Sequence, residues 1–338
     1  MKRAVSYDDV LLVPHYSDIN SRIEVNLGNA LDEHIYLDIP IISSPMDTIT
    51  ESKMASTIAR AGGLGIIHRY NNVWEQTKLV RDAVSCDLSI TVGAAVGVTG
   101  DYFQRSAELI DSGAEVLCID MAHGHHVLME RAVKTLKDRY GELVHIMAGN
   151  IATAEGYEHL STWGADSVRC GIGGGSICST RIETGHGVPT LQTVLDCAAL
   201  DLNAKVIADG GLKSSGDIVK ALAAGADFVM VGSLLGGTTE APGKTIAREG
   251  RRYKEYRGMA SREAKMVWRQ DSSYSEGVSS IIPHKGEVTQ VLERLRQGIA
   301  SGFSYSGARN IEELWSKAEF VIQTTAGRLE SSTHILNR

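Results

Sequence analysis

Short, β-rich apolar runs recur along this 338-residue chain at nearly even spacing, and this repeat constrains the fold more than any other feature. Eight runs can be recognised, at 41–44, 64–67, 90–93, 116–119, 145–148, 167–170, 206–209 and 228–231. Most begin about 22 to 29 residues after the previous run, and the intervening segments, such as 101–110, place apolar residues with a helical period. Each strand with its following helix therefore forms one β/α unit.

The number and character of these units favour a closed barrel. Near-continuous apolar strands are typical of parallel sheets, which are buried on both faces. Glycine follows several predicted helices just before the next strand, where it allows the left-handed conformation that ends a helix; the positions are Gly62, Gly113, Gly164 and Gly225. Eight units exceed the roughly six strands of an open doubly wound sheet. We predict a single (β/α)8 TIM barrel over residues 1–338, with a short active-site flap at roughly 259–283 and a C-terminal tail at roughly 318–338.

Charge and apolar run length exclude several classes of protein. The formal net charge is −7 and no long basic block occurs, which argues against a nucleic-acid partner. No apolar run reaches the roughly 18 residues that a membrane span needs. We expect a cytoplasmic protein that binds neither nucleic acid nor membrane. The five cysteines are odd in number, and we interpret Cys118, Cys170 and Cys197 as inert core residues rather than parts of a disulfide framework.

The longest interval between strands, after the sixth run, contains the densest glycine cluster, Gly171 to Gly175. Barrel chemistry collects at the carboxyl ends of the strands, so this loop is the first candidate site. Its backbone can cradle an oxyanion or phosphate through N–H groups, or a monovalent cation through carbonyls. A thiol close to a cation and to backbone N–H groups ionises readily, so we predict that Cys178, near Arg181, is a nucleophile.

Two further clusters follow predicted strands. Gly210, Gly211 and Gly232 end the seventh and eighth runs, where barrel enzymes frequently bind phosphate, so a phosphomonoester substrate is plausible. The segment His123–His126 contains three histidines that could ligate zinc. Because neither a cysteine pair nor an H-E-x-x-H motif accompanies it, we interpret it as a polar active-site rim.

Several motifs, in order along nearly the whole chain, resemble the IMP dehydrogenase/GMP reductase family of purine nucleotide enzymes. They are Tyr7–Pro14, Ser43–Thr48, Gly171–Arg181, Ala208–Gly211, Gly232–Leu235 and Tyr256–Met259. The resemblance implies a barrel that assembles as a homotetramer, and a loop cysteine, here Cys178, that attacks C2 of a purine 5′-monophosphate. It assigns the nucleotide's phosphate, ribose and base to Ser44, Arg169, Ser176, Asp209, Gly211, Gly232, Ser233, Tyr256, Gly258 and Met259.

The resemblance also implies a nicotinamide cofactor and a potassium ion. Asp120 and Asn150 would border the nicotinamide, and we place His123 with them on this side of the site. Carbonyl groups of Gly171, Gly173 and Cys178 would hold potassium, with Glu330 contributed from a neighbouring subunit.

Two activities occur in this family, and the flap favours one of them. A dehydrogenase hydrolyses its covalent adduct with a base from an Arg-Tyr pair after the Gly-Met motif, and this chain has no such pair. It also lacks the regulatory module that most dehydrogenases insert after the second β/α unit. We therefore expect an NADPH-dependent GMP reductase that forms a thioimidate on Cys178, with Thr180 and Glu276 acting on the leaving amine.

The alternative is an NAD-dependent IMP dehydrogenase without the module. The sequences of Gly232–Leu235 and Glu240–Gly243 resemble the dehydrogenase branch of the family. Its hydrolytic base would be sought first at Arg269 or Tyr274. A non-catalytic nucleotide-binding module and a flavin-dependent barrel are weaker alternatives. The module would be free to lose Cys178, Thr180 or Asp209, all of which are present, and a yellow protein would reveal the flavin.

Overall fold

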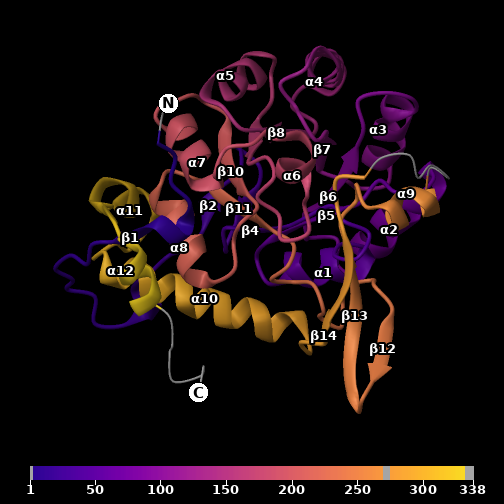
Figure 1. Ribbon diagram of the computed structural model, residues 1–338. Helices are drawn as coiled ribbons and strands as arrows, with labels where there is room; N and C mark the ends of the chain where they lie inside the picture. The colour runs from indigo at the N-terminus through magenta and orange to yellow at the C-terminus, as the bar shows by residue number, and fades with distance from the viewer. Residues whose placement is uncertain (1–2, 269–274, 332–338) are drawn as a thin grey trace.

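The computed structural model describes residues 3–268 and 275–331. Its centre is a closed barrel of parallel strands, with β11 hydrogen-bonded back to β4, so the predicted (β/α)8 barrel is confirmed (Figure 1). The barrel strands are β4 (Ile41–Ser43), β5 (Leu64–Ile67), β6 (Val92–Val96), β7 (Val116–Asp120), β8 (His145–Ile151), β9 (Ser167–Cys170), β10 (Lys205–Asp209) and β11 (Phe228–Val231). The third strand starts at Val92 rather than at Ile90, which is buried without belonging to the sheet.

Helices form the outer layer of the barrel, and polar caps define where several of them begin. The side chains of Asn72, Thr153 and Ser214 accept backbone N–H groups in the first turns of α2, α5 and α8. The helices between and after the barrel strands are α1 (Ser52–Arg60), α2 (Val73–Val84), α3 (Tyr102–Asp111), α4 (Val127–Tyr140), α5 (Ala154–Thr162), α6 (Thr180–Thr184), α7 (Thr190–Ala198), α8 (Ser215–Ala223) and α10 (Val288–Tyr305). The predicted glycines after α1, α3, α5 and α8 all have positive φ.

Alternate residues of the barrel strands pack into two separate hydrophobic clusters. The inner cluster fills the barrel and includes Ile42, Val116 and Phe228. The outer cluster contains their neighbours, such as Ile41 and Val229, which meet the surrounding helices. Apolar burial on both faces is what the near-continuous apolar runs predicted.

A short hairpin closes the amino end of the barrel. It consists of β2 (Asn29–Ala30) and β3 (Tyr36–Leu37), and its residues Leu31, Ile35 and Leu37 join the inner cluster. Solvent is thereby kept from the bottom of the barrel, and the opening lies at the carboxyl ends of the strands.

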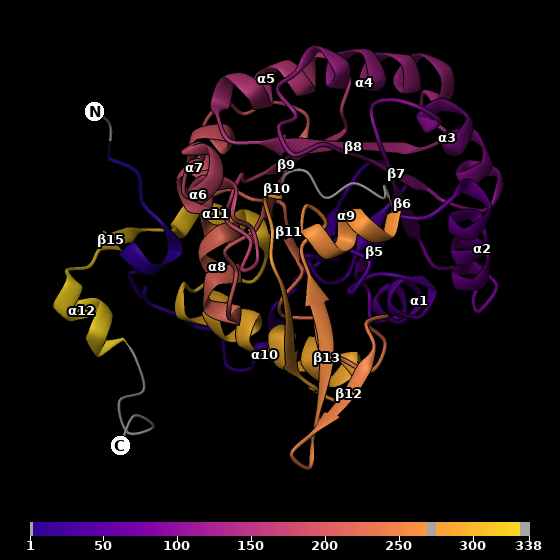
Figure 2. The same ribbon diagram turned by 45° about the vertical axis from the view of Figure 1, so that its right-hand side comes forward.

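Two additions to the barrel include the segments predicted as flap and tail, but the first begins earlier in the chain, because its first two strands precede residue 259. An antiparallel sheet of β12 (Thr245–Arg248), β13 (Arg251–Arg257) and β14 (Ser279–Pro283) projects from the barrel, and α9 (Arg262–Trp268) belongs to the flap (Figure 2). Arg269 and Tyr274 lie outside the described residues. In the tail, β15 (Phe320–Ile322) pairs with β1 (Val10–Leu12) and precedes α12 (Thr325–Glu330); α11 (Ile311–Lys317) lies just before it.

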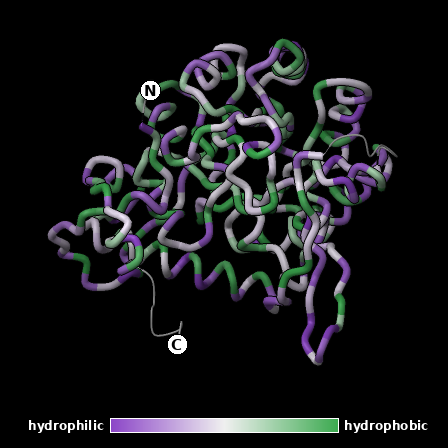
Figure 3. Tube along the Cα trace, in the orientation of Figure 1, coloured by the Kyte–Doolittle hydropathy of each residue, from purple (hydrophilic) through white to green (hydrophobic). Residues whose placement is uncertain are grey.

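Hydropathy follows this architecture. Hydrophobic segments gather at the centre of the molecule, while the tip of the β12–β13 hairpin is hydrophilic (Figure 3). Within the described residues, no helix combines the length and the apolar character that crossing a membrane requires.

Candidate active site

A cavity of about 440 Å³ opens at the carboxyl ends of the barrel strands. It brings together all ten residues that the sequence analysis assigns to the nucleotide, along with Cys178, Thr180 and Glu276. Asp120 and Asn150 also line it, whereas His123 and Glu330 do not. Residues from at least six different strand ends and from the flap therefore meet in one place.

The glycine loop after β9 packs directly on the loop after β10. Gly171 has φ +144, and a Cβ at this position would collide with the carbonyl oxygen of Asp209. Gly210 has φ +98, and a Cβ there would lie 3.1 Å from the backbone of Gly174 and Gly175. Only glycine allows both this backbone conformation and this close approach, so the glycines bring the loop that carries Cys178 against the end of β10.

The predicted nucleophile and its two partners form a continuous hydrogen-bonded chain. The Cys178 thiol lies 3.2 Å from Thr180 Oγ1, and the Thr180 hydroxyl donates to Glu276 Oε2 at 2.8 Å. The backbone fixes this register, because Ser179 N–H donates to the Glu276 carbonyl at 3.0 Å and Val278 N–H donates to the Ile177 carbonyl at 3.0 Å. A proton can move between sulfur and carboxylate through one hydroxyl group.

Arg181 does not have the role that the sequence suggested. Its guanidinium donates to the Ile172 carbonyl at 3.0 and 3.2 Å and to the Val188 carbonyl at 2.6 Å. The side chain is committed to the backbone of the glycine loop, because it fills the space that Gly173 and Gly187 leave open. Arg181 therefore holds the loop together, and the partner of Cys178 is Thr180.

A buried network of charges forms the floor of the cavity. Arg169 on β9 donates to Asp120 Oδ1 at 2.9 Å and to Asp209 Oδ2 at 3.0 and 3.1 Å. Burial acts to raise the pKa of Asp120, but the positive charges of Arg169 and Arg69 outweigh it and hold that pKa below its usual value. The amide of Asn150 also donates to Asp209 Oδ2, at 2.8 Å. Two strand ends, those of β7 and β10, thus present fixed carboxylates to the cavity.

Hydroxyl groups and glycines form the opposite wall. The hydroxyls of Ser176 and Tyr256 are 3.1 Å apart. A Cβ at Gly232 would lie 3.2 Å from Met46 Sδ and 3.5 Å from Ser44 Oγ, so a larger residue would intrude on this wall. Hydroxyls and the backbone N–H groups of glycines are suited to hold a phosphate by hydrogen bonds.

An aromatic wall of the cavity was missed by the sequence analysis. Tyr70 and Trp268 meet edge to face with ring centroids 4.9 Å apart, and the Arg69 guanidinium lies 5.1 and 5.9 Å from their rings. Trp268 comes from α9 of the flap, so its approach depends on the tertiary fold. Aromatic rings beside Asp120 fit a flat nicotinamide ring.

His123 is exposed and does not line the cavity. Burial and the positive charges of His125, His126 and His186 lower its pKa. Its expected place beside the cofactor stays a prediction, because it does not line the cavity.

The carbonyl groups expected to hold potassium differ in their hydrogen bonds, and the potassium site stays a prediction. The carbonyl of Gly171 already accepts the Asn150 amide at 2.8 Å. The carbonyls of Gly173 and Cys178 accept no hydrogen bond from the described residues, so they are suited to a cation. Glu330 is exposed at the end of α12, outside the cavity, and a contribution from it requires a second copy of the chain.

Comparisons with a family model, with related sequences and with a solved structure all indicate the same protein family. The model of the IMP dehydrogenase / GMP reductase domain matches residues 4–334. An inosine-5′-monophosphate dehydrogenase from Nitrosopumilus maritimus is 35% identical, over 98% of this chain and 98% of that protein. A GMP reductase from Leishmania major is 33% identical, over 100% of this chain and 98% of that protein. The crystal structure of a Cys-to-Ala variant of Trypanosoma brucei GMP reductase, in complex with guanosine 5′-monophosphate, superposes with a TM-score of 0.93 at 32% identity and covers 99% of this chain and 98% of that one.

Proposed function

This chain belongs to the IMP dehydrogenase/GMP reductase family, and we propose that within it the protein is an NADPH-dependent GMP reductase. The observation that carries the proposal is the chain of hydrogen bonds from Cys178 through Thr180 to Glu276. The reaction converts GMP into IMP and ammonia.

The first chemical step is addition of sulfur to C2 of the purine. The Cys178 thiol gives up its proton through Thr180 to Glu276, and the S–C2 bond forms. Glu276, now protonated, returns a proton through Thr180 to the 2-amino group, and the C–N bond breaks with release of ammonia. The product is a thioimidate on Cys178.

The cofactor, when bound, supplies a hydride to C2. The Cys178 loop, Tyr70 and Trp268 all line the cavity, and we infer that the nicotinamide would bind between them. Asp120 and Asn150 would orient the nicotinamide, and expulsion of the Cys178 thiolate from C2 then frees IMP. Asp209, fixed by Arg169, would accept the ribose hydroxyls, while Ser176, Gly211 and Ser233 would donate to the phosphate. Potassium would be held by the carbonyls of Gly173 and Cys178, and the assembly would be a homotetramer in the cytoplasm.

The absence of the regulatory module does not distinguish a GMP reductase from an IMP dehydrogenase in this family. The alignment with the Leishmania major GMP reductase extends over 482 positions, far more than the 338 residues of this chain, so that reductase contains a large segment that this chain lacks. The alignment with a Cryptosporidium parvum dehydrogenase extends over only 385 positions and still covers 95% of that protein. The choice between the two activities therefore depends on the chemistry of the active site.

Dehydrogenation of IMP with NAD is the second candidate, because several relatives have that name. The deciding experiment follows the absorbance of reduced nicotinamide with the purified protein. We expect GMP to cause oxidation of NADPH with release of ammonia and IMP, and IMP with NAD to give little or no NADH. Steady NADH formation with production of xanthosine monophosphate would overturn the reductase proposal.

A further inference from the structure

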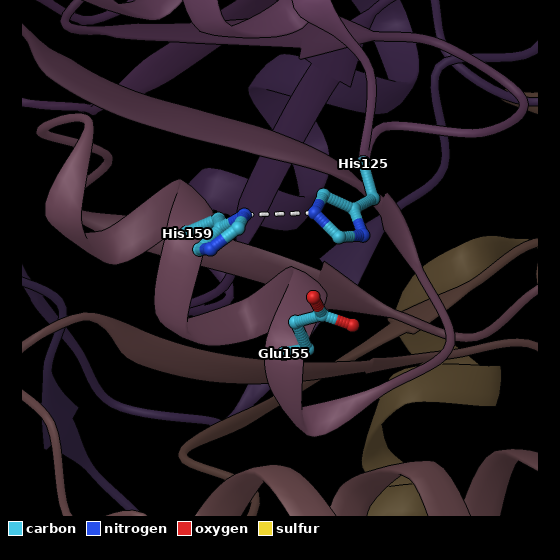
Figure 4. Close-up of side chains that lie close together, drawn as sticks. All are labelled: His125, Glu155 and His159. Atoms are coloured by element: carbon cyan, nitrogen blue, oxygen red, sulfur yellow. Dashed lines mark hydrogen bonds between the residues drawn. The ribbon is translucent and has the colours of Figure 1, made fainter.

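Outside the cavity, three potential metal ligands converge on the rim of the barrel. His125 follows β7, while Glu155 and His159 lie four residues apart on α5, on one face of the helix. His125 Nε2 and His159 Nδ1 are 2.8 Å apart, and one ligand atom from each of the three residues lies within 4.8 Å of the others. Figure 4 shows the Glu155 carboxylate directed toward the pair of rings.

The chemistry of this cluster suits a metal ion. The two facing nitrogens share one hydrogen bond. A metal ion bound by both would take the place of the shared hydrogen, and each ring would keep its N–H on its other nitrogen. Two histidines and one carboxylate are a common ligand set for Zn²⁺, with the fourth position left to water.

Binding of one ion by both rings requires a small increase in the distance between His125 Nε2 and His159 Nδ1. At the usual Zn–N distance, two nitrogens of a tetrahedral site lie about 3.3 Å apart, so they must separate by about half an ångström. Glu155 and His159 are exposed and His125 is half-buried, so their side chains can make this adjustment by rotation.

We propose that His125, Glu155 and His159 form a binding site for a divalent transition-metal ion of the Zn²⁺ type. The site is separate from the catalytic cavity, because none of the three residues lines it. The sequence analysis interpreted the histidines at 123–126 as a polar rim since no second ligand motif followed them; the missing ligands come from the next β/α unit, where Glu155 and His159 sit one helical turn apart.

Binding would join the loop after β7 to α5. That loop is already attached to the end of β8, because Met121 N–H donates to the Gly149 carbonyl at 2.9 Å and Gly124 N–H donates to the Asn150 carbonyl at 2.6 Å. The ion would thus add a side-chain link beside an existing backbone link, at a loop whose Met121 and Ala122 line the cavity.

Cobalt is the appropriate probe, because its absorption distinguishes nitrogen and oxygen ligands from thiolate. The full chain, freed of metal by a chelator, is titrated with Co²⁺, and Zn²⁺ is then added as a competitor. We expect one saturable equivalent with weak visible bands and no thiolate charge-transfer band. Glu155→Gln and His159→Ala should each weaken binding by at least about 10-fold, while Glu158→Gln, an exposed acid on the same helix, should leave it unchanged.

Two controls keep the result interpretable. Thermal unfolding of each variant without metal checks that the fold is intact, and the Glu155→Gln change keeps the size of the side chain. The Cys178→Ala variant removes the reactive thiol and should bind Co²⁺ as the parent protein does. Equal affinity in Glu155→Gln, His159→Ala and the parent, or a thiolate band that disappears in Cys178→Ala, would overturn the proposal.

Discussion

The two ends of the barrel use carboxylates in different ways. At the amino end, Asp166 accepts the Ile146 N–H at 2.8 Å and pairs with Lys137 at 2.7 Å. Asp227, two barrel strands later, makes the same two kinds of contact. It accepts the Val206 N–H at 2.8 Å and pairs with Lys205 at 2.9 Å. Each carboxylate there caps the start of a strand and is satisfied by its own neighbours.

At the carboxyl end, carboxylates from separate strands share one buried guanidinium. Arg169 lies between Asp120 and Asp209 and pairs with both. Arg69 also pairs with Asp120, with its Nε 3.2 Å from Asp120 Oδ2. Both carboxylates line the cavity. The comparison teaches that a charge pair at the amino end stabilises the barrel, whereas the shared network holds carboxylates in place for a ligand.

Replacing the nucleophile should have the largest effect on turnover. This effect should arise only at the carboxyl end of the barrel. We expect Cys178→Ala to lower turnover by at least about 10⁴-fold, because no other group can form the covalent bond. Nucleotide affinity, measured by calorimetry, should stay within about one order of magnitude, since ground-state binding depends on the other residues of the cavity. Cys86→Ala, at an exposed thiol, is the matched control and should be fully active. Turnover near the parent level in Cys178→Ala would exclude covalent catalysis.

The second prediction concerns proton transfer at the leaving amine. Glu276→Gln keeps a hydrogen bond with Thr180 but cannot accept or return a proton, so kcat should fall by about 10² to 10³-fold. KM for the nucleotide should change little. Glu263→Gln, at an exposed flap residue bonded to Ser279, serves as the control. If both variants lose activity equally, the effect belongs to flap structure and not to proton transfer.

The third prediction compares the two ends directly. Asp209→Ala should weaken nucleotide binding by about 2 to 4 kcal/mol, because charge-assisted hydrogen bonds in a desolvated site are lost. Asp227→Ala should leave that affinity unchanged and lower the free energy of unfolding by about 1 to 3 kcal/mol, because the Val206 N–H and Lys205 lose their partner. Calorimetry and urea unfolding on both variants separate the two effects, and an Asp227→Ala protein that loses affinity would contradict the division between the ends.

The sequence was sufficient for the barrel, because local patterns specify it, whereas most residues of the cavity were assigned through the resemblance to a family. Apolar runs and helix-ending glycines specify the β/α units, and strand direction places residues such as Asp120 and Asp209 at one end. Contacts between distant segments were harder to predict. Trp268 on α9 reaches Tyr70 only because the flap folds back over the barrel, and no periodicity marks that contact.

Arg181 shows the opposite error. It stands three residues after Cys178, so proximity in the chain suggested a contact with the thiol. Its long side chain instead turns back to the carbonyls of Ile172 and Val188. Direction of a side chain in a glycine-rich loop depends on positive-φ residues such as Gly173 and Gly187, which cannot be read from spacing.

The smallest effect is expected at the amino end, at Asp32. Burial acts to raise the pKa of this carboxyl, but hydrogen bonds from His145 and from the backbone N–H groups of His34 and Ile35 outweigh it and lower the pKa to about 2. A depressed pKa means that the carboxylate stabilises the fold above its ordinary pKa of 3.8, and that this contribution is lost as the pH falls toward 2. The carboxylate is partly exposed to solvent, so Asp32→Asn should lower the unfolding free energy near neutral pH by only about 1 kcal/mol. Urea unfolding should show this difference narrowing between about pH 5 and about pH 3, while Glu33→Gln, at the exposed neighbour, matches the parent protein near neutral pH. A difference that stays constant over this range would show that Asp32 acts through packing and not through its charge.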